Sequence, residues 1–164
     1  MVTYYCTNCW AEVAPVACTC PECGRPVEDA QANLTDKYVA ALRHPQPETR
    51  LRAAWMLGRM RAASAVPALL ALVEAKSDYD PYVLSAALKS LGQIGDRRAV
   101  RVLASLLADP HAPFMARMEA AYALAAIGGA EAWAVLEQAA EHDASERVRQ
   151  AAARPLLDLT RHPA

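Results

Sequence analysis

The stretch that decides the fold is ALKSLGQIGDRRAVRVLASLLAD, residues 87–109. On both sides of its central Gly-Asp pair, apolar residues return every three or four positions, which is the period of an α-helix. A half-buried strand would instead alternate apolar and polar residues strictly. Gly and Asp are turn-forming residues, so the stretch predicts a helix, a turn and a second helix.

This helix–turn–helix pattern occurs four times in the chain. Helical segments anchored on Leu57, Leu91, Leu124 and Leu156 follow one another at spacings of 34, 33 and 32 residues. They read, in order, PETRLRAAWMLG (47–58), PYVLSAALKSLG (81–92), FMARMEAAYALA (114–125) and ERVRQAAARPLL (146–157). A second apolar stretch precedes each of them: KYVAALRH (37–44), AVPALLALVEA (65–75), AVRVLASLLAD (99–109) and AWAVLEQAAEH (132–142). Repeats of this length predict an all-α solenoid of four units and eight helices in a right-handed or gently curved stack.

The composition favours tightly packed helices over a β-sandwich. Hydrophobic residues make up 54% of the chain but aromatic residues only 6%, so much of the apolar content is alanine. Paired alanines occur in the second helical segment of every unit, at 53/54, 86/87, 120/121 and 152/153. Small side chains there let neighbouring helices approach closely, and we expect these alanines to lie in the core.

The repeats resemble the HEAT-repeat family, in particular the short repeats named after phycobilin lyases. The resemblance covers residues 35–160 or so, and the second unit carries the family pattern best. The signature arginine of the family matches Arg50, Arg117 and Arg149, whereas Leu84 stands in its place in the second unit. The resemblance implies that this arginine ties neighbouring turns together through aspartates, and that this ladder is looser at Leu84.

Five cysteines precede the repeats. Cys6-x2-Cys9 and Cys20-x2-Cys23 are two CxxC pairs with ten residues between them. Two such turns facing each other give four thiolates in a tetrahedral set, which suits zinc and leaves no position for water. The spacing predicts one structural Zn²⁺ held by these four cysteines, with Cys18 as the spare. A ligand set that includes Cys18 would need the looser C-x4-C spacing.

The stretch CTNCWAEVAPVACTCPECGRPV, residues 6–27, resembles the short zinc-ribbon modules found at the ends of many bacterial proteins. The positions that match the ribbon pattern are Cys6, Cys9, Val13, Cys20, Pro21, Cys23, Gly24 and Pro26. The chain departs from the pattern at Trp10, where the ribbons usually have glycine after the first cysteine pair.

We expect three parts in the chain: a zinc ribbon over residues 1–29, a linker over 30–34 and the solenoid over 35–161. Residues 1–29 are too few to bury a useful core, so their fold should depend on the metal. The net charge is −3 in residues 1–30 and +4 in residues 31–61, within a chain of net charge −1. An acidic ribbon is poorly suited to binding phosphates.

Charge and hydropathy exclude several classes of protein. A net charge of −1 gives no general case for binding nucleic acid or an anionic membrane. No apolar run approaches ~18 residues, which argues against a transmembrane helix. The first ten residues, MVTYYCTNCW, lack the basic start and apolar run of a signal peptide. We therefore expect a reducing cytoplasm, where clustered cysteines hold metal more often than they form disulfides.

Motifs for catalysis are not found in the repeats. The sequence has no phosphate-binding glycine loop, no nucleophile elbow and no His-Glu pair at ligand spacing. Some metal-dependent hydroxylases built from HEAT repeats use such His-Glu pairs, so that activity is not expected here. The histidines lie in turns or near the C-terminus, where solvated side chains are expected: His44, His111, His142 and His162. The resemblance to phycobilin lyases implies bilin-lyase activity as an alternative, although the matching positions belong to the repeat scaffold.

One equivalent position in the four units carries large or charged residues. In order these are Trp55, Lys89, Tyr122 and Arg154. The resemblance implies that this helix lines the concave face of the stack, with this position pointing away from the core. Arg52 and Arg59 lie on the same helix face as Trp55, which suits an acidic partner that carries aromatic groups. The six residues are candidate partner-binding residues, but Trp55 packed under the ribbon or the next repeat fits the sequence equally well.

The sequence therefore predicts a cytoplasmic, non-enzymatic adaptor or scaffold that holds a protein partner of unknown identity, without a small-molecule substrate. Two alternatives stay open. One is a bilin-lyase-like or chaperone-like subunit that acts on a tetrapyrrole-bearing protein, which rests on the resemblance alone. The other is nucleic-acid binding through the arginine-rich first repeat, which the overall charge disfavours.

Overall fold

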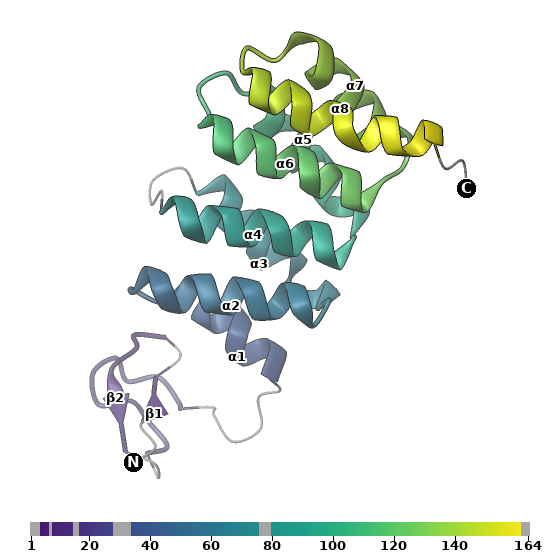
Figure 1. The fold of residues 1–164 in the computed structure, drawn as a ribbon. Coiled ribbons are helices and arrows are strands. Elements are labelled where there is room, and N and C mark those ends of the chain that lie inside the picture. Colours follow the sequence, from purple (N-terminus) through teal and green to yellow (C-terminus); the bar gives the residue numbers. More distant parts are fainter. Residues whose placement is uncertain (1–3, 7, 15–16, 28–33, 76–79, 162–164) are drawn as a thin grey trace.

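The computed structural model describes residues 4–6, 8–14, 17–27, 34–75 and 80–161. Within them the chain forms two short strands and eight α-helices (Figure 1). The elements are β1 (Tyr4–Tyr5), β2 (Glu12–Val13), α1 (Leu34–Ala41), α2 (Pro47–Arg59), η1 (Ala63–Ala65), α3 (Val66–Glu74), α4 (Pro81–Ile94), η2 (Arg97–Ala99), α5 (Val100–Ala108), α6 (Phe114–Ile127), α7 (Ala130–His142) and α8 (Glu146–Arg161). The prediction of four helix–turn–helix units behind a small cysteine module is confirmed. None of the helices in these segments is both long and apolar enough to cross a membrane.

The helices are arranged in two layers (Figure 1). Helices α2, α4, α6 and α8 lie side by side in one layer, each in contact with the next. Helices α1, α3, α5 and α7 lie behind them, each against the helix that follows it in the chain. A single apolar core runs through all four units. Six of the eight paired alanines are buried in it as predicted, whereas Ala86 is only partly buried against it and Ala153 is half-buried and not part of it. We call α2, α4, α6 and α8 the second-helix layer.

Helix α4 shows how the sequence sets the ends of a helix. Its N-cap is Asp80, whose Oδ1 accepts hydrogen bonds from the backbone N–H groups of Tyr82 at 2.9 Å and Val83 at 3.0 Å. Pro81 fits the first turn because it has no N–H that needs an acceptor there. The helix stops where Gly95 takes a φ of 74°, a left-handed conformation that glycine adopts without a Cβ clash.

Neighbouring helices of the second-helix layer approach closely at the Leu-Gly pairs of the repeats. A Cβ at Gly92 would lie 2.9 Å from the Cα of Ala123 in α6, and a Cβ at Gly58 would lie 2.6 Å from Ser90 Oγ in α4. Ser90 is buried, and its Oγ donates to the carbonyl oxygen of Ala54 in α2 at 2.7 Å. Glycine is therefore needed at these two positions because the next helix of the same layer leaves no room for a methyl group.

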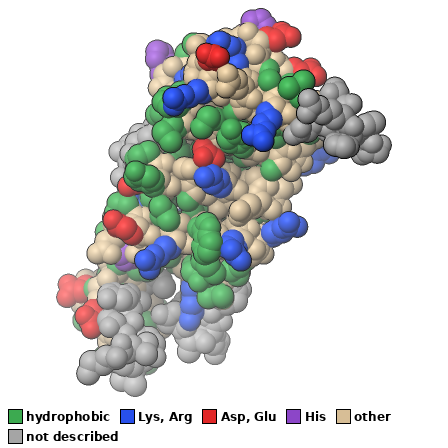
Figure 2. All heavy atoms as spheres, in the orientation of Figure 1, with side chains coloured by type: hydrophobic (Ala, Val, Ile, Leu, Met, Phe, Trp, Pro, Cys, Tyr) green, Lys and Arg blue, Asp and Glu red, His purple; other side chains and the backbone are tan. Residues whose placement is uncertain are grey.

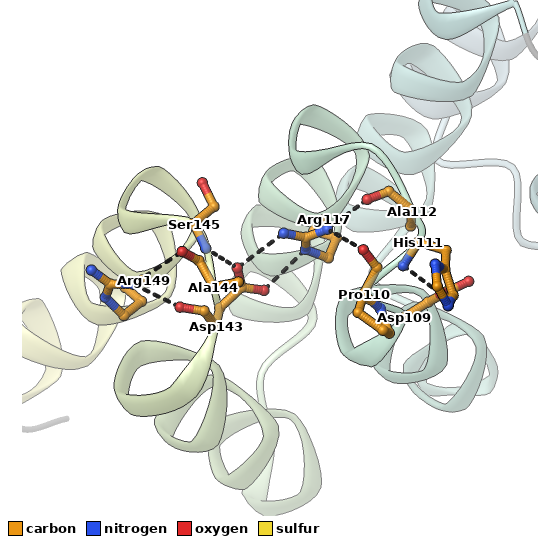
Figure 3. A network of polar contacts seen from close by, with 9 residues as sticks. All are labelled: Asp109, Pro110, His111, Ala112, Arg117, Asp143, Ala144, Ser145 and Arg149. Atoms are coloured by element: carbon orange, nitrogen blue, oxygen red, sulfur yellow. Dashed lines mark hydrogen bonds and ion pairs between the residues drawn. The ribbon is translucent and has the colours of Figure 1, made fainter.

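Arg117 of α6 ties two successive turns of the stack together (Figure 3). The residue is only 7% exposed, and its Nε and Nη2 donate to the two carboxylate oxygens of Asp143 at 3.0 and 3.1 Å. Its Nη1 donates to the carbonyl oxygen of Ala112 in the preceding turn at 2.5 Å. Arg149 of α8 then donates to the carbonyl oxygen of Asp143 at 2.7 Å. The arginine–aspartate ladder implied by the family resemblance is present between α6 and α8.

The second unit is linked to its neighbours at the opposite edge of the layer. Leu84 is buried, and its side chain has no hydrogen-bond donor in place of the arginine. Arg98 of η2 instead donates from Nη2 to the carbonyl oxygen of Ala63 in η1 at 3.1 Å. Arg97 of η2 lies against the next turn along, where a Cβ at Gly129 would be 2.6 Å from its Nη2. Arginines therefore bridge turns at both edges of the layer, and the second unit uses the edge at the C-terminal ends of α2, α4 and α6.

We expect Arg117→Ala to lower the free energy of unfolding by about 3–5 kcal/mol, because it leaves the buried Asp143 carboxylate without its cation. Arg149→Ala removes hydrogen bonds to backbone carbonyls only, and should cost about 1–2 kcal/mol. Urea unfolding followed by circular dichroism at 222 nm measures both. Equal losses in the two variants would contradict the assignment of the ladder to the buried ion pair.

Candidate functional site

The four cysteines of the two CxxC pairs come together in the N-terminal module. Strands β1 and β2 pair antiparallel, and an isolated bridge joins Thr19 and Pro26, so that the two cysteine turns face each other. The Sγ atoms of Cys6 and Cys23 are 3.6 Å apart, those of Cys9 and Cys20 are 3.5 Å apart, and all four lie within 4.8 Å of one another. In the part of the chain that the structure describes, this is the only group of three or more His, Cys, Asp or Glu residues able to hold a metal ion.

The spacing of the sulfur atoms fits a tetrahedral thiolate site. A metal–sulfur bond of about 2.3 Å places tetrahedral ligands about 3.8 Å apart. A disulfide would bring two sulfurs to about 2.0 Å, and none of the cysteines forms one. The predicted cluster of four cysteines is confirmed, and its donor set suits a metal such as zinc. Cys18 lies outside the cluster on the exposed surface, and its carbonyl oxygen accepts a hydrogen bond from the N–H of Val27 at 3.0 Å.

Backbone N–H groups point at the sulfur atoms and favour the thiolate form. The N–H groups of Cys9 and Asn8 hold the pKa of Cys6 below its usual range. Asn8 N–H donates to Cys6 Sγ at 3.4 Å. In the second turn, the N–H of Arg25 is the largest cause that lowers the pKa of Cys23 to about 6. Both turns are thus built to carry negative charge on sulfur.

The four sulfurs cannot all ionise at little cost without a cation. The N–H of Ala11 acts to lower the pKa of Cys9, but desolvation and the neighbouring sulfur of Cys20 outweigh it and raise the pKa to about 12. A divalent cation at the centre of the cluster would remove this repulsion between thiolates.

Trp10 occupies the position in the first cysteine turn that Gly24 occupies in the second. Each is the fourth residue after the first cysteine of its pair, and each donates its N–H to that cysteine's carbonyl oxygen, at 2.9 and 3.0 Å. Both take a left-handed φ, 62° for Trp10 and 69° for Gly24. The ring of Trp10 meets His44 edge to face, with ring centroids 4.5 Å apart. The departure from the ribbon pattern at Trp10 therefore keeps the backbone conformation and adds a contact with the repeats.

The column of residues predicted for partner binding lies on the outside of the second-helix layer. All four members are exposed, with 49% of Trp55 and 42% of Tyr122 accessible to solvent. The Arg59 guanidinium lies 5.0 Å from the centre of the Trp55 ring, and Arg52 is exposed on the same helix. Figure 2 shows hydrophobic and basic side chains intermixed over this layer. The alternative interpretation, in which Trp55 is buried under the ribbon or the next repeat, does not fit a side chain that is half exposed.

Sequence reasoning missed two features of this layer. Glu119 of α6 is only 13% exposed in its side chain and pairs with Lys89 of α4 at 3.3 Å, so the predicted Lys89 is already engaged. Glu119 occupies the position equivalent to Arg52. Because the two residues carry opposite charges, a comparison of the repeats for similar side chains does not detect this position. Exposed apolar residues also gather at the starts of α4 and α6. They are Tyr82, Phe114 and Met115.

The predicted histidines do not converge. His44 contacts Trp10, and its Nδ1 accepts from the N–H of Gln46 at 3.0 Å. His111 is exposed in the turn before α6 and His142 is exposed at the last residue of α7, as expected for solvated side chains. The fourth, His162, lies outside the described residues.

Comparison with known proteins places these features in context. The sequence model of the family described as HEAT repeats matches residues 35–117 and 74–156. The bilin biosynthesis protein PecE of Mastigocladus laminosus is 37% identical over 117 residues, which is 70% of this chain and 40% of that protein. PecE of Nostoc sp. strain PCC 7120 is 41% identical over 112 residues, 68% of this chain and 42% of that protein. The chain thus spans about two fifths of the length of these relatives.

The fold is shared with solved structures of other proteins. Human deoxyhypusine hydroxylase in complex with glycerol superposes with a TM-score of 0.64 at 27% identity, over 79% of this chain and 46% of that one. A chain of the complex of CpcE and CpcF of phycocyanin lyase from Nostoc sp. PCC7120 superposes with a TM-score of 0.53 at 26% identity, over 85% of this chain and 70% of that one.

These relatives correct the functional prediction. The sequence was interpreted as a non-enzymatic adaptor because no catalytic motif is found in it, but its similarity is to bilin biosynthesis proteins and to lyase subunits. The physical reason for the error is that motif searches detect catalysis by a compact set of side chains. A subunit of an enzyme can contribute a surface instead, and a repeat scaffold of this kind carries no such motif.

We expect Cys20→Ser to abolish the binding of one Zn²⁺ per chain, because it removes one of the four thiolates. Cys18→Ser should retain a full equivalent, since Cys18 lies outside the cluster. The number of zinc ions per chain in the purified variants, measured by mass spectrometry, tests both expectations. Equal zinc loss from both changes would show that the cluster is not the ligand set.

Proposed function

Since this chain belongs to the HEAT-repeat family, we propose that it is a bilin-lyase-like subunit that acts on a tetrapyrrole-bearing protein. The observation that carries the proposal is the 37% identity to PecE over 117 residues. The similarity to a chain of the CpcE–CpcF complex supports the proposal, because that protein with the same fold is one of two subunits of a lyase. On that similarity we infer that this chain acts together with a second protein.

The outer face of the second-helix layer has the chemistry that an open-chain tetrapyrrole requires. A bilin presents a flat conjugated π-system, pyrrole N–H donors and two propionate carboxylates. Trp55 and Tyr122 offer exposed aromatic rings for the π-system. Arginine guanidinium groups bind carboxylates through paired hydrogen bonds, and the exposed arginines of this face include Arg52, Arg59 and Arg154.

The carboxylate of Glu119 is the acceptor on this face for pyrrole N–H groups. It lies between α4 and α6, held by Lys89 at 3.3 Å and approached by Ser85 Oγ at 3.4 Å. Packed helices lie about 8–10 Å apart, so an extended chromophore would contact two or three neighbouring helices of the layer. In this proposal the chain holds and orients the chromophore, and none of its residues is assigned a catalytic step.

The cysteine module has a structural role in the proposal. Four thiolates leave a zinc ion without an open position, so the metal stabilises the fold of residues 1–29 and does no chemistry. The expected linker of residues 30–34 lies outside the described residues except for Leu34, which is the first residue of α1, and the solenoid follows it. Clustered cysteines without disulfides fit a reducing compartment, and we infer the cytoplasm on that ground.

The direct test is titration of the zinc-loaded chain with phycocyanobilin, followed by visible absorbance. We expect a shifted bilin band that saturates, because a bilin held against rings and charges loses its solvent-averaged conformations. Trp55→Ala should weaken binding by roughly 2 kcal/mol, or about 30-fold, the scale of a central aromatic contact. Arg52→Ala and Arg59→Ala should add losses that shrink at high salt, because exposed charges are screened.

The control is Glu137→Gln, an exposed change on α7 in the other layer, which should leave the titration unchanged. Melting of the Trp55→Ala chain should be nearly that of the wild type, because truncating a half-exposed ring opens no cavity. A bilin spectrum that stays the same with the chain, both alone and in the presence of a phycocyanin apoprotein, would refute the proposed role.

A further inference from the structure

We propose that the metal-loaded cysteine module and the first repeat form one folding unit, coupled through Trp10 and His44, so that metal loss loosens the helix that carries Trp55. The inference rests on the proposed zinc site and is independent of the bilin role. It gives the ribbon a regulatory function: metal occupancy sets the rigidity of the face at α2.

The backbone at Trp10 shows that its side chain is placed at a cost. A left-handed φ of 62° is unusual for a bulky residue, and Gly24 fills the equivalent position in the second turn without a side chain. Glycine would adopt this conformation freely. Tryptophan at this position strains the local backbone, and it gains an edge-to-face contact with His44, with ring centroids 4.5 Å apart.

His44 is fixed to the first repeat on its other side. The residue follows α1, and its own N–H donates to the carbonyl oxygen of Ala41 at 3.1 Å. Its Nδ1 accepts from the N–H of Gln46, the N-cap residue of α2, which has no side-chain cap of its own. The ring that Trp10 contacts is therefore part of the turn that starts α2.

The first repeat is the part of the solenoid where an added contact has most effect. Helix α1 has no fully buried residue, whereas α3, α5 and α7 each have at least two. A weakly buried terminal helix opens more readily than the centre of a stack. The charges also favour docking, because residues 1–30 carry a net −3 and residues 31–61 a net +4.

Loss of the metal disrupts the contact between Trp10 and His44 by opening the first cysteine turn. Trp10 keeps its left-handed conformation because the first cysteine turn is closed around it, with Trp10 N–H on the carbonyl oxygen of Cys6 at 2.9 Å. Without a metal, no bond links the four cysteines, and the closed turn loses the binding free energy that stabilises it. Trp10 then leaves His44, and the start of α2 loses its support.

The experiment measures the melting temperature of the full chain by circular dichroism at 222 nm, zinc-loaded and after removal of zinc with a chelator. In the wild type we expect chelation to lower the helical melting temperature by about 2–4 °C, the effect of one aromatic pair in a chain of this size. Trp10→Gly should still bind one zinc, because glycine suits the left-handed turn, but its helices should melt at the same temperature with and without metal.

A second variant guards against misfolding of the ribbon. His44→Asn removes the ring from the repeat side, and its side-chain oxygen can still accept from the N–H two residues on, as Asn does in turns. It should bind zinc and show no chelation shift. Glu22→Gln, an exposed change inside the ribbon, should keep both the zinc and the full shift.

The zinc proposal and the coupling fail in distinguishable ways. A wild-type chain that binds one zinc yet melts identically with and without it would overturn the coupling and leave the zinc site standing. A chelation shift that persists in His44→Asn would also overturn it. A chain that binds no zinc would remove both.

Discussion

Helices α2, α4 and α6 lie so close together that neither Gly58 nor Gly92 has room for a methyl group. This short distance between neighbouring helices restricts the residues at their contacts to small ones: glycine, alanine and the buried Ser90. The large side chains of these helices consequently lie in the core between the layers, at the buried Arg117, or on the outside, as Trp55 and Tyr122 do. The exposed aromatic face is a consequence of close packing behind it.

Small residues bury little apolar area, so the stack gains stability from its turns as well. Arg117 is buried with its partner Asp143, and each arginine bond spans two turns that are far apart in the sequence. Arg98 does the same at the other edge, with both partners exposed to solvent or nearly so. The buried clamp is the stronger constraint, because an unpaired charge there would pay its full desolvation cost.

The cysteine module draws its stability from a different source. Among the residues that the structure describes, its buried cluster consists of Cys6, Val13 and Cys20, too few apolar groups for a fold without a metal. The solenoid has a continuous core and needs none. The contact between Trp10 and His44 joins a metal-dependent module to a core-dependent one, at the least buried helix of the stack.

The sequence by itself determined the repeats, because helical period, alanine pairs and turn residues are local signals that each unit carries. It determined the cysteine cluster as well, since the CxxC spacing allows few geometries for four thiolates. Its motifs could not determine the function, because a surface built from several helices leaves no contiguous pattern. Only the tertiary structure decided the contacts between distant residues: Trp10 with His44, Arg98 with Ala63, and Glu119 with Lys89. Each of these depends on how the modules or helices come to lie beside one another, and no spacing along the chain encodes that arrangement.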